Sequence, residues 1–206
     1  MAYEYTVFLS YHRDLRVDAV GRQSMSVVGE WVHEVFHPHL KKWLVEFDPD
    51  AKVAFDGDLA QGARSEHHVR GLLTRSRCML VVFSAPYFAS RWCRAEWHSM
   101  LAREQLRDGG VELVIPVVFA DGDHFDDQAK DRVQGRDAHR MQPFTVLGPR
   151  NQDHASFPDF RAEIRRLCAQ ICECARNAPE WREDFPWESP EPLAARRPFS
   201  PPSLQG

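Results

Sequence analysis

The sequence lacks the features that mark several large classes of protein. Its 206 residues contain no run of 18 apolar residues, so no membrane-spanning helix is expected. The five cysteines are an odd number and do not form a disulfide framework, which favours a reducing compartment. No basic segment followed by an apolar one opens the chain, so no signal peptide is visible. These absences together predict a protein of the cytoplasm.

An excess of positive charge is also missing. With 26 basic and 30 acidic residues, the net charge of −4 leaves no electrostatic footprint for nucleic acid. Neither G-x-G-x-x-G after the first apolar run nor G-x-x-x-x-G-K-[ST] occurs, which excludes a phosphate held by such a glycine-rich turn. Apolar residues are plentiful instead. At 43% hydrophobic and 11% aromatic, the chain can build the core of one domain with short extensions.

Strand-like and helix-like segments alternate along the chain. The strand-like runs are residues 5–9, 52–55, 78–83 and 113–119, with 144–146 as a short last strand. Apolar stripes at helical spacing lie within 28–40, 69–73 and 160–171. The alternation predicts an α/β fold, with five parallel strands in a flavodoxin-like order flanked by helices.

Prolines refine this prediction at several places. Pro38 lies inside the first helical stripe and is expected to kink or break that helix. Pro116 removes one hydrogen-bond donor from its strand, which indicates a bulge or a position near the edge of the sheet. Seven of the 14 prolines occur from Pro179 onward. We therefore expect one domain at residues 1–177 and an extended or disordered tail at 178–206, packed on the domain through its aromatic residues.

Polar segments follow three of the predicted strands, at residues 10–14, at 56–65 and from Ser84 onward. Ligands of open parallel sheets bind beyond the carboxyl ends of the strands, so these segments mark the expected site. A phospho-receiver domain of the same topology would need acidic residues where Ser10 and Ser84 stand. That class is therefore excluded.

One segment resembles a known family closely. Residues 81–97 are VVFSAPYFASRWCRAEW, and the pattern of an apolar strand, Ser, Tyr and then Ser-x-Trp-Cys-x-x-Glu resembles the TIR (Toll/interleukin-1 receptor) family. Residues 7–11 look like the first strand of that family, 59–62 like its BB loop, and 115–117 like its fourth strand. The resemblance runs from about residue 5 to about residue 175. It implies the same fold that the alternation of strands and helices predicts.

The resemblance implies one of two functions. Some TIR domains cleave NAD⁺ at the nicotinamide–ribose bond, as NAD⁺ glycohydrolases or ADP-ribosyl cyclases, with a Glu that matches Glu96. A short TIR protein of this kind is similar to bacterial immune proteins that signal infection by phage, alone or through a downstream effector that senses the nucleotide product. Other TIR domains are non-catalytic adaptors that only bind further TIR domains. The presence of both Trp92 and Glu96 favours the enzyme.

A single carboxylate suffices for this chemistry. Glycoside hydrolysis usually needs a second carboxyl group to protonate the leaving group. Nicotinamide leaves from a cationic pyridinium ring and needs no general acid. The remaining task is to stabilise positive charge on the ribose, which Glu96 would do. Trp92 lies four residues before Glu96, hence on the same helical face, and could form an aromatic wall beside the cationic ring.

The remaining site residues follow from the same resemblance. Phe8 and Ser10 would line the nucleotide pocket, Arg13 would face the pyrophosphate, and the loop at 56–62 with Gly62 would cover the opening. Ser84, after the central strand, completes the predicted substrate-binding set. NAD⁺ would be a substrate, so no cofactor is expected. Contacts between TIR domains imply a homo-oligomer, with no nucleic acid or membrane as partner.

Simpler roles remain open for these residues. Glu96 could be a surface carboxylate, Trp92 a packing residue and Arg13 an ion-paired charge. Ser10 and Ser84 could cap turns, and Gly62 could serve only the backbone of its loop.

No metal is expected, although the sequence contains patterns that resemble metal sites. Residues 33–37 match H-E-x-x-H, but Pro38 follows at once and the apolar stripe puts the two histidines on the polar face. Cys168, Cys172 and Cys174 contain no C-x-x-C pair and are expected to be core thiols, as is Cys93. Acidic residues follow the fourth strand at 121–127, where a solvated turn is the default and a cation site the alternative.

Overall fold

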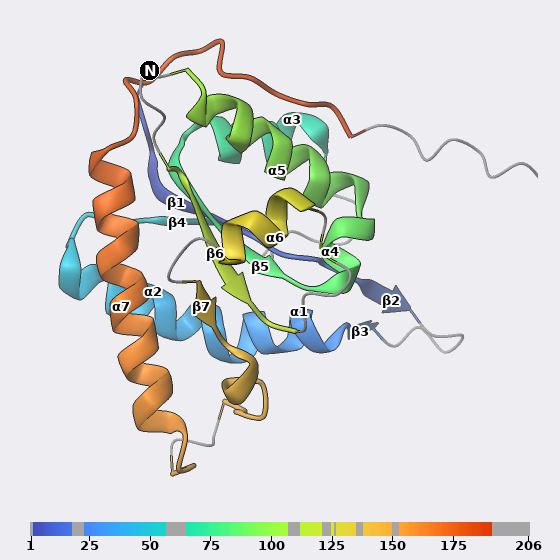
Figure 1. Ribbon diagram of the computed structural model, residues 1–206, viewed down its shortest axis with the longest axis vertical. Coiled ribbons are helices and arrows are strands. Elements are labelled where there is room, and N and C mark those ends of the chain that lie inside the picture. Colours follow the sequence, from blue (N-terminus) through green and yellow to red (C-terminus); the bar gives the residue numbers. More distant parts are fainter. Residues whose placement is uncertain are drawn as a thin grey trace, which may run out of the picture.

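The computed structural model describes residues 2–17, 23–56, 65–106, 112–120, 125, 127–134, 138–149 and 153–190. A five-stranded sheet forms the centre of the molecule (Figure 1). Its strands are β1 (Tyr5–Ser10), β4 (Val53–Phe55), β5 (Ser76–Phe83), β6 (Val114–Val118) and β7 (His139–Arg140). All four pairings between neighbouring strands are parallel, in the order β4-β1-β5-β6-β7. The predicted flavodoxin-like α/β fold is confirmed.

The central strand β5 is buried as its sequence predicts. Cys78 to Phe83 expose no side-chain or backbone surface, because β5 lies between β1 and β6 and has helices on both faces. Pro116 pairs in register with Val81. The Phe119 N–H bonds back to β5, at the Phe83 carbonyl, so by alternation Pro116 faces the β7 side, where pairing begins only at Val117. The absence of an N–H at Pro116 therefore removes no hydrogen bond between paired strands. Strand β6 lies next to the edge strand β7, in agreement with the predicted position near the edge.

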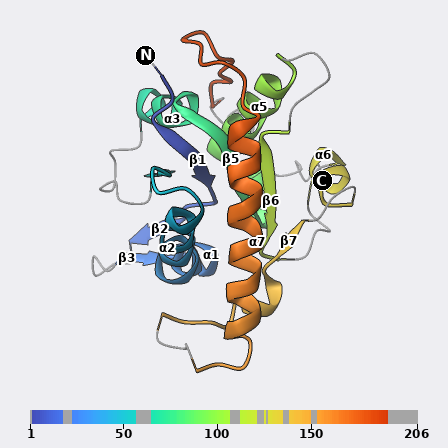
Figure 2. The same cartoon turned by 90° about the vertical axis from the view of Figure 1, so that its left-hand side faces the viewer.

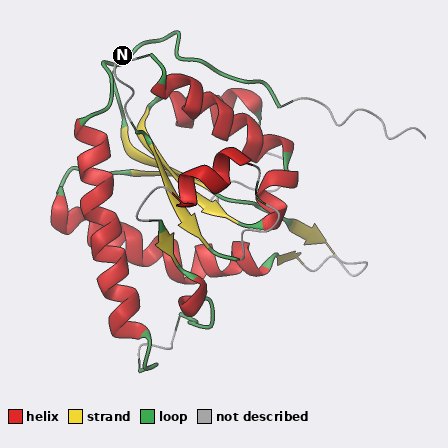
Figure 3. Cartoon of the chain, viewed as in Figure 1, coloured by secondary structure: helices red, strands yellow, loops and turns green. Residues whose placement is uncertain are grey.

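Helices cover both faces of the sheet (Figure 3). On one face, α2 (His37–Phe47) packs against α7 (Phe157–Arg176), and on the other α3 (Glu66–Thr74) packs against α5 (Arg91–Glu104), as Figure 2 shows. The short helices are α4 (Ala85–Ala89) and α6 (Asp127–Gln134). Ser65 caps α3, with its Oγ accepting a hydrogen bond from the His68 N–H. Within the described residues no helix has the length and apolarity to span a membrane.

The helical segment continues through Pro38, so the break that was one of the two expected outcomes does not occur. Helix α1 (Val27–Trp31) leads into a π-helical turn, η1 (Val32–Phe36), and α2 follows directly with Pro38 in its first turn. The His37 N–H donates to the Val32 carbonyl, five residues back. The π turn changes the helical register just before the proline ring, and Pro38 lies in the first turn of α2, the part of a helix where a missing N–H is best tolerated.

The predicted last strand at 144–146 is wrong. Residues Gln142–Phe144 form a 3₁₀ turn, η4, with Pro143 in its first positions, and the edge strand is β7 instead. The Met141 N–H donates to the Val118 carbonyl and ends the ladder just before that turn. A small antiparallel hairpin of β2 (Leu15–Val17) and β3 (Gln23–Met25) lies between β1 and α1 and was not predicted from the sequence.

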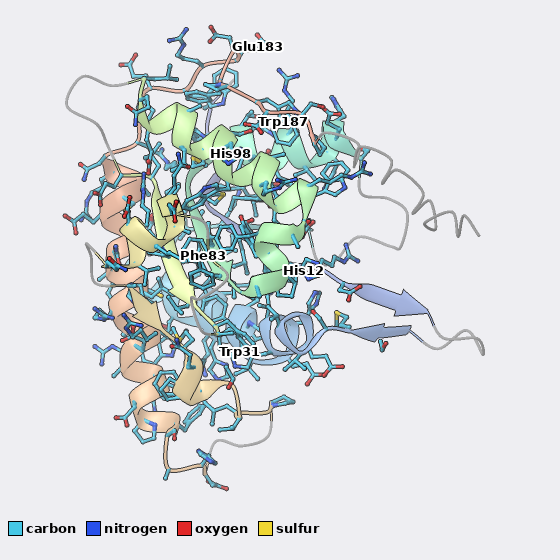
Figure 4. All side chains as sticks on the ribbon, turned by 45° about the vertical axis from the view of Figure 1, so that its right-hand side comes forward. His12, Trp31, Phe83, His98, Glu183 and Trp187 are labelled. Carbon is cyan, nitrogen blue, oxygen red and sulfur yellow. The ribbon has the colours of Figure 1, made fainter. Side chains whose placement is uncertain are left out.

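Residues 178–190, here called the C-terminal strap, run along the domain in extended form. Phe185 is 2% exposed, with its ring stacked on Tyr3 and lying 3.7 Å from the Arg103 guanidinium. Burial lowers the pKa of Arg103, which nevertheless donates to the Tyr3 hydroxyl at 2.8 Å. Further on, the Trp187 indole N–H donates to Glu66 at the start of α3 (Figure 4). The strap thus ties α5 and α3 together.

The edge strand β7 is held to α7 by a buried histidine. His139 has no exposed surface, its Nδ1 lies 2.7 Å from Glu163 Oε1, and its Nε2 lies 2.6 Å from Gln170 Oε1. Arg166 donates to the same Glu163 carboxylate at 2.6 Å. Burial alone would raise the pKa of Glu163, but the hydrogen bonds from His139 and Arg166 outweigh it and lower that pKa to about 2.

Glu163 should therefore make the stability of the fold depend on acid pH. Because its folded pKa lies below the usual 4.5, its contribution is complete above about pH 4.5 and is lost as the pH falls toward about 2. We expect the free energy of unfolding of Glu163→Gln to fall less steeply than that of wild type over this interval. Urea unfolding at a series of pH values measures it. Identical pH slopes for both proteins would contradict the assignment.

Candidate active site

Glu96 is a carboxylate buried inside the fold. It lies on the second turn of α5, whose first turn is capped by Ser90, with its Oγ accepting from the Cys93 N–H. Glu96 has no exposed surface. A buried charge needs strong partners, because desolvation of an unpaired carboxylate costs several kcal/mol or more. The partners therefore define the site.

Ser10 provides one of these partners. Its hydroxyl donates to Glu96 Oε2 at 2.6 Å, and Ser10 itself is 1% exposed at the carboxyl end of β1. An O–H···O distance this short is typical of a bond to an ionised acceptor. Residues 10 and 96 are thus joined although they lie 86 positions apart in the sequence. The carboxylate lies where ligands of such sheets bind, beyond the carboxyl ends of the strands.

Tyr87 extends this contact to α4. Its hydroxyl lies 2.8 Å from Ser10 Oγ and 3.1 Å from the carbonyl oxygen of Cys93. The Cys93 thiol donates to the Tyr11 carbonyl at 3.6 Å, which links the start of α5 to the chain just after β1. Cys93 is fully buried, in agreement with its predicted packing role.

Ser84 lies at the carboxyl end of β5, the strand next to β1. It stands at the N-cap of α4 but makes no side-chain cap hydrogen bond. Its Oγ is buried and has no hydrogen-bond partner within the part of the chain that the structure describes. Capping, the simpler role considered for Ser84, is therefore not observed. A buried hydroxyl without a partner is a group that a bound ligand can satisfy.

The other predicted site residues lie at different depths. Phe8 is 1% exposed inside β1, two residues before Ser10 and on the same face of the sheet. Trp92 is half-buried on the first turn of α5 and packs against the core. Arg13 is half-buried, and its Nη1 donates to the Asp56 carbonyl at 2.9 Å, joining the segments after β1 and β4. Gly62 and the loop at 57–64 lie outside the described residues.

The structure thus brings together Ser10 and Glu96 from the predicted set. It adds Tyr87, which the sequence analysis placed in the family pattern without giving it a role. Its position in Ser-x-x-Tyr was the only available signal, because the partner of a phenol is decided by tertiary contacts.

Two neighbouring histidines belong to an aromatic cluster. His33 Nε2 lies 2.7 Å from the Tyr11 hydroxyl, and the His37 ring stacks on Phe55 with centroids 4.0 Å apart. Both histidines are half-buried against Phe55, so their expected place on a polar face is wrong. The π turn between them shifts the second histidine out of helical register. The described residues contain no group of three or more His, Cys, Asp or Glu that could hold a metal ion.

The cysteines of α7 behave as core thiols. Cys168 is fully buried, while Cys172 and Cys174 are partly exposed. Burial, together with the neighbouring Cys172, raises the pKa of Cys168 to about 12. A thiol that stays protonated is a poor nucleophile and a poor metal ligand. The acidic residues at 121, 123 and 126 lie outside the described part of the chain.

A comparison with family models agrees with the fold. A family model described as TIR domain matches residues 7–146. One similar solved structure is that of the activated Roq1 resistosome directly recognizing the pathogen effector XopQ, in its TIR domains. The two chains share 18% sequence identity over 83% of this chain and 95% of that one, with a TM-score of 0.39. No curated protein matches the sequence.

Proposed function

This chain belongs to the TIR domain family, and we propose that it cleaves NAD⁺ at the nicotinamide–ribose bond with Glu96 as the catalytic carboxylate. The products would be nicotinamide and either ADP-ribose or a cyclised nucleotide. The enzyme would thus be an NAD⁺ glycohydrolase or an ADP-ribosyl cyclase.

The observation that carries this proposal is the buried carboxylate at the carboxyl end of β1. Glu96 is 0% exposed and is held by the Ser10 hydroxyl at 2.6 Å. A carboxylate fixed in this way at the carboxyl edge of the sheet would be placed to stabilise positive charge on a bound ribose.

The chemistry needs little more than this charge. Nicotinamide departs as a neutral molecule from a cationic ring, so no proton has to be delivered to it. Positive charge then develops on the ribose, and a carboxylate fixed in a region of low dielectric constant stabilises it more strongly than water would. Because Ser10 already orients Glu96, little reorganisation is required during the reaction.

The remaining predicted residues would contact the rest of NAD⁺. The unsatisfied hydroxyl of Ser84 would bond to the nucleotide beside Glu96. Trp92 would flank the nicotinamide ring and Arg13 would face the pyrophosphate. Phe8 would form the apolar floor below Ser10, and Gly62 would belong to the loop that covers the opening.

Access to Glu96 requires a change on binding. The carboxylate has no exposed surface, so it would meet the ribose only after the side chains that cover it move. The free energy of NAD⁺ binding would drive that displacement. The apparent affinity for NAD⁺ would be low, because the open form of the site that binds it would be a minor population.

The wider setting of this activity follows from the same resemblance. We propose that the protein acts in the cytoplasm as a homo-oligomer formed through contacts between TIR domains. Its product would serve antiviral signalling against phage, through loss of NAD⁺ or through a downstream effector that senses the nucleotide. NAD⁺ would be the substrate, and the proposal assigns no separate cofactor.

Incubation of the purified protein with NAD⁺ tests the proposal. We expect free nicotinamide in stoichiometric amount with ADP-ribose or a cyclic isomer, identified by chromatography and mass spectrometry. The protein should be assayed at high concentration and with a crowding agent, because an oligomer forms by mass action. An absence of nicotinamide under all these conditions would leave the adaptor function as the explanation of the family membership.

A further inference from the structure

We propose that Tyr87 is a positioning residue for this reaction, which fixes the Glu96 carboxylate by acting through the Ser10 hydroxyl. The inference rests on the proposed function and adds to it a residue with no expected contact to NAD⁺. It also gives Ser10 a role different from lining the nucleotide pocket.

The number of hydroxyl hydrogens available decides which group donates in each of the two hydrogen bonds. The single hydrogen of Ser10 is used for Glu96 Oε2 at 2.6 Å, because an ionised carboxylate has none to give. Ser10 Oγ and the Tyr87 hydroxyl are 2.8 Å apart, a distance that requires a hydrogen between the two oxygens. Tyr87 must therefore donate. The hydrogen bonds run from Tyr87 to Ser10 and from Ser10 to Glu96.

Of the two oxygens that hydrogen-bond geometry places beside the Tyr87 hydroxyl, Ser10 Oγ and the Cys93 carbonyl, the carbonyl is the weaker acceptor. The Cys93 carbonyl lies 3.1 Å from the Tyr87 hydroxyl, farther than Ser10. That carbonyl belongs to α5, where it already accepts the helical N–H four residues later. Ser10 Oγ, whose own hydrogen points away, offers the phenol an uncommitted lone pair.

The tyrosine ring is held firmly enough to position its partners. Tyr87 has no exposed surface and contacts Phe83 and Phe88 at centroid distances of 6.1 and 5.2 Å. Ser10 and Glu96 are equally buried, so the three polar groups polarise one another in a medium of low dielectric constant. Loss of the phenolic hydrogen weakens the Ser10 bond and lets the carboxylate rotate, although nothing that touches the substrate has been removed.

A double-mutant cycle on nicotinamide release tests this role. Tyr87→Phe keeps the ring and removes only the hydroxyl, and we expect about a fivefold to tenfold lower kcat with KM within about twofold. Ser10→Ala should lower kcat by about 10- to 100-fold, while Ser10→Thr, which keeps a hydroxyl, should recover most of it. If Tyr87 acts through Ser10, adding Tyr87→Phe to Ser10→Ala should cause no further loss.

Tyr3→Phe is the matched control. It removes a phenol with two hydrogen-bond contacts, to the Pro179 carbonyl and to Arg103, but just before β1 begins, at the opposite end of that strand from Ser10. Its kcat should equal that of wild type. Multiplicative effects of Tyr87→Phe and Ser10→Ala, or a Tyr87→Phe kcat equal to wild type, would overturn the role of Tyr87 alone. A wild-type protein without activity would instead overturn the proposed function, and this role with it.

Discussion

In the Glu96→Gln variant, the kcat for nicotinamide release is expected to fall by about two to three orders of magnitude. The amide keeps the size of the side chain and still offers an oxygen to the Ser10 hydroxyl, which lies 2.6 Å from Glu96 Oε2. What disappears is the negative charge that faces the ribose in the transition state. Because this charge interacts with the transition state more than with the ground state, KM should change much less than kcat.

Stability should respond in the opposite sense to activity. A buried carboxylate pays for desolvation, and its replacement by a neutral amide of equal shape removes that cost. We expect the free energy of unfolding of Glu96→Gln to equal or exceed that of wild type in urea titrations. Glu173→Gln, on the exposed face of α7, controls for loss of one acidic charge and should leave kcat unchanged. A marked loss of stability in Glu96→Gln would indicate a structural role instead.

Glu104→Ala should produce the largest loss of stability, about 3–5 kcal/mol. Glu104 is 3% exposed, and its Oε1 accepts the Leu113 and Val114 N–H groups at 2.7 and 3.0 Å, together with Arg132 Nη1 at 3.0 Å. The other oxygen pairs with Arg132 Nη2. One carboxylate therefore joins α5, the start of β6 and α6, and alanine leaves both backbone donors and the guanidinium without their acceptor.

Two variants separate this effect from a general loss of charge. Glu4→Ala removes an exposed partner of Arg75 and should change the urea midpoint very little. The pair of substitutions Glu104→Ala and Arg132→Ala should be less destabilising than the sum of the two single ones, since the unpaired guanidinium is then absent. A Glu104→Ala protein within about 1 kcal/mol of wild type would contradict the account, given the size expected for a broken buried pair.

The strand order and the central core could be predicted from the sequence because they depend on patterns that act locally. The apolar run at 78–83 and the stripes of α3 and α7 specify buried faces by their period alone. The edge strand His139–Arg140 could not be found in this way. It has two residues and no apolar pattern, and it is defined by hydrogen bonds to β6 and by the contacts of His139 with α7.

The site was predictable in its place but not in its contacts. Ser10 and Glu96 were both expected at the carboxyl edge of the sheet, yet the bond between them joins positions 86 residues apart and depends on side-chain rotamers. The direction of the Tyr87 hydroxyl could not be predicted, because it depends on how the tyrosine ring packs against Phe83. The π turn before Pro38 could not be predicted either, because the spacing of apolar residues does not distinguish a π turn from an α-helical one.

The central claim concerns one carboxylate, and the rate of nicotinamide release from saturating NAD⁺ tests it most directly. Wild type and Glu96→Gln should be measured side by side, at equal concentration and with matched circular-dichroism spectra. The account predicts steady release by wild type and a rate at least about a hundredfold lower for the variant. Equal rates from the two proteins would contradict it.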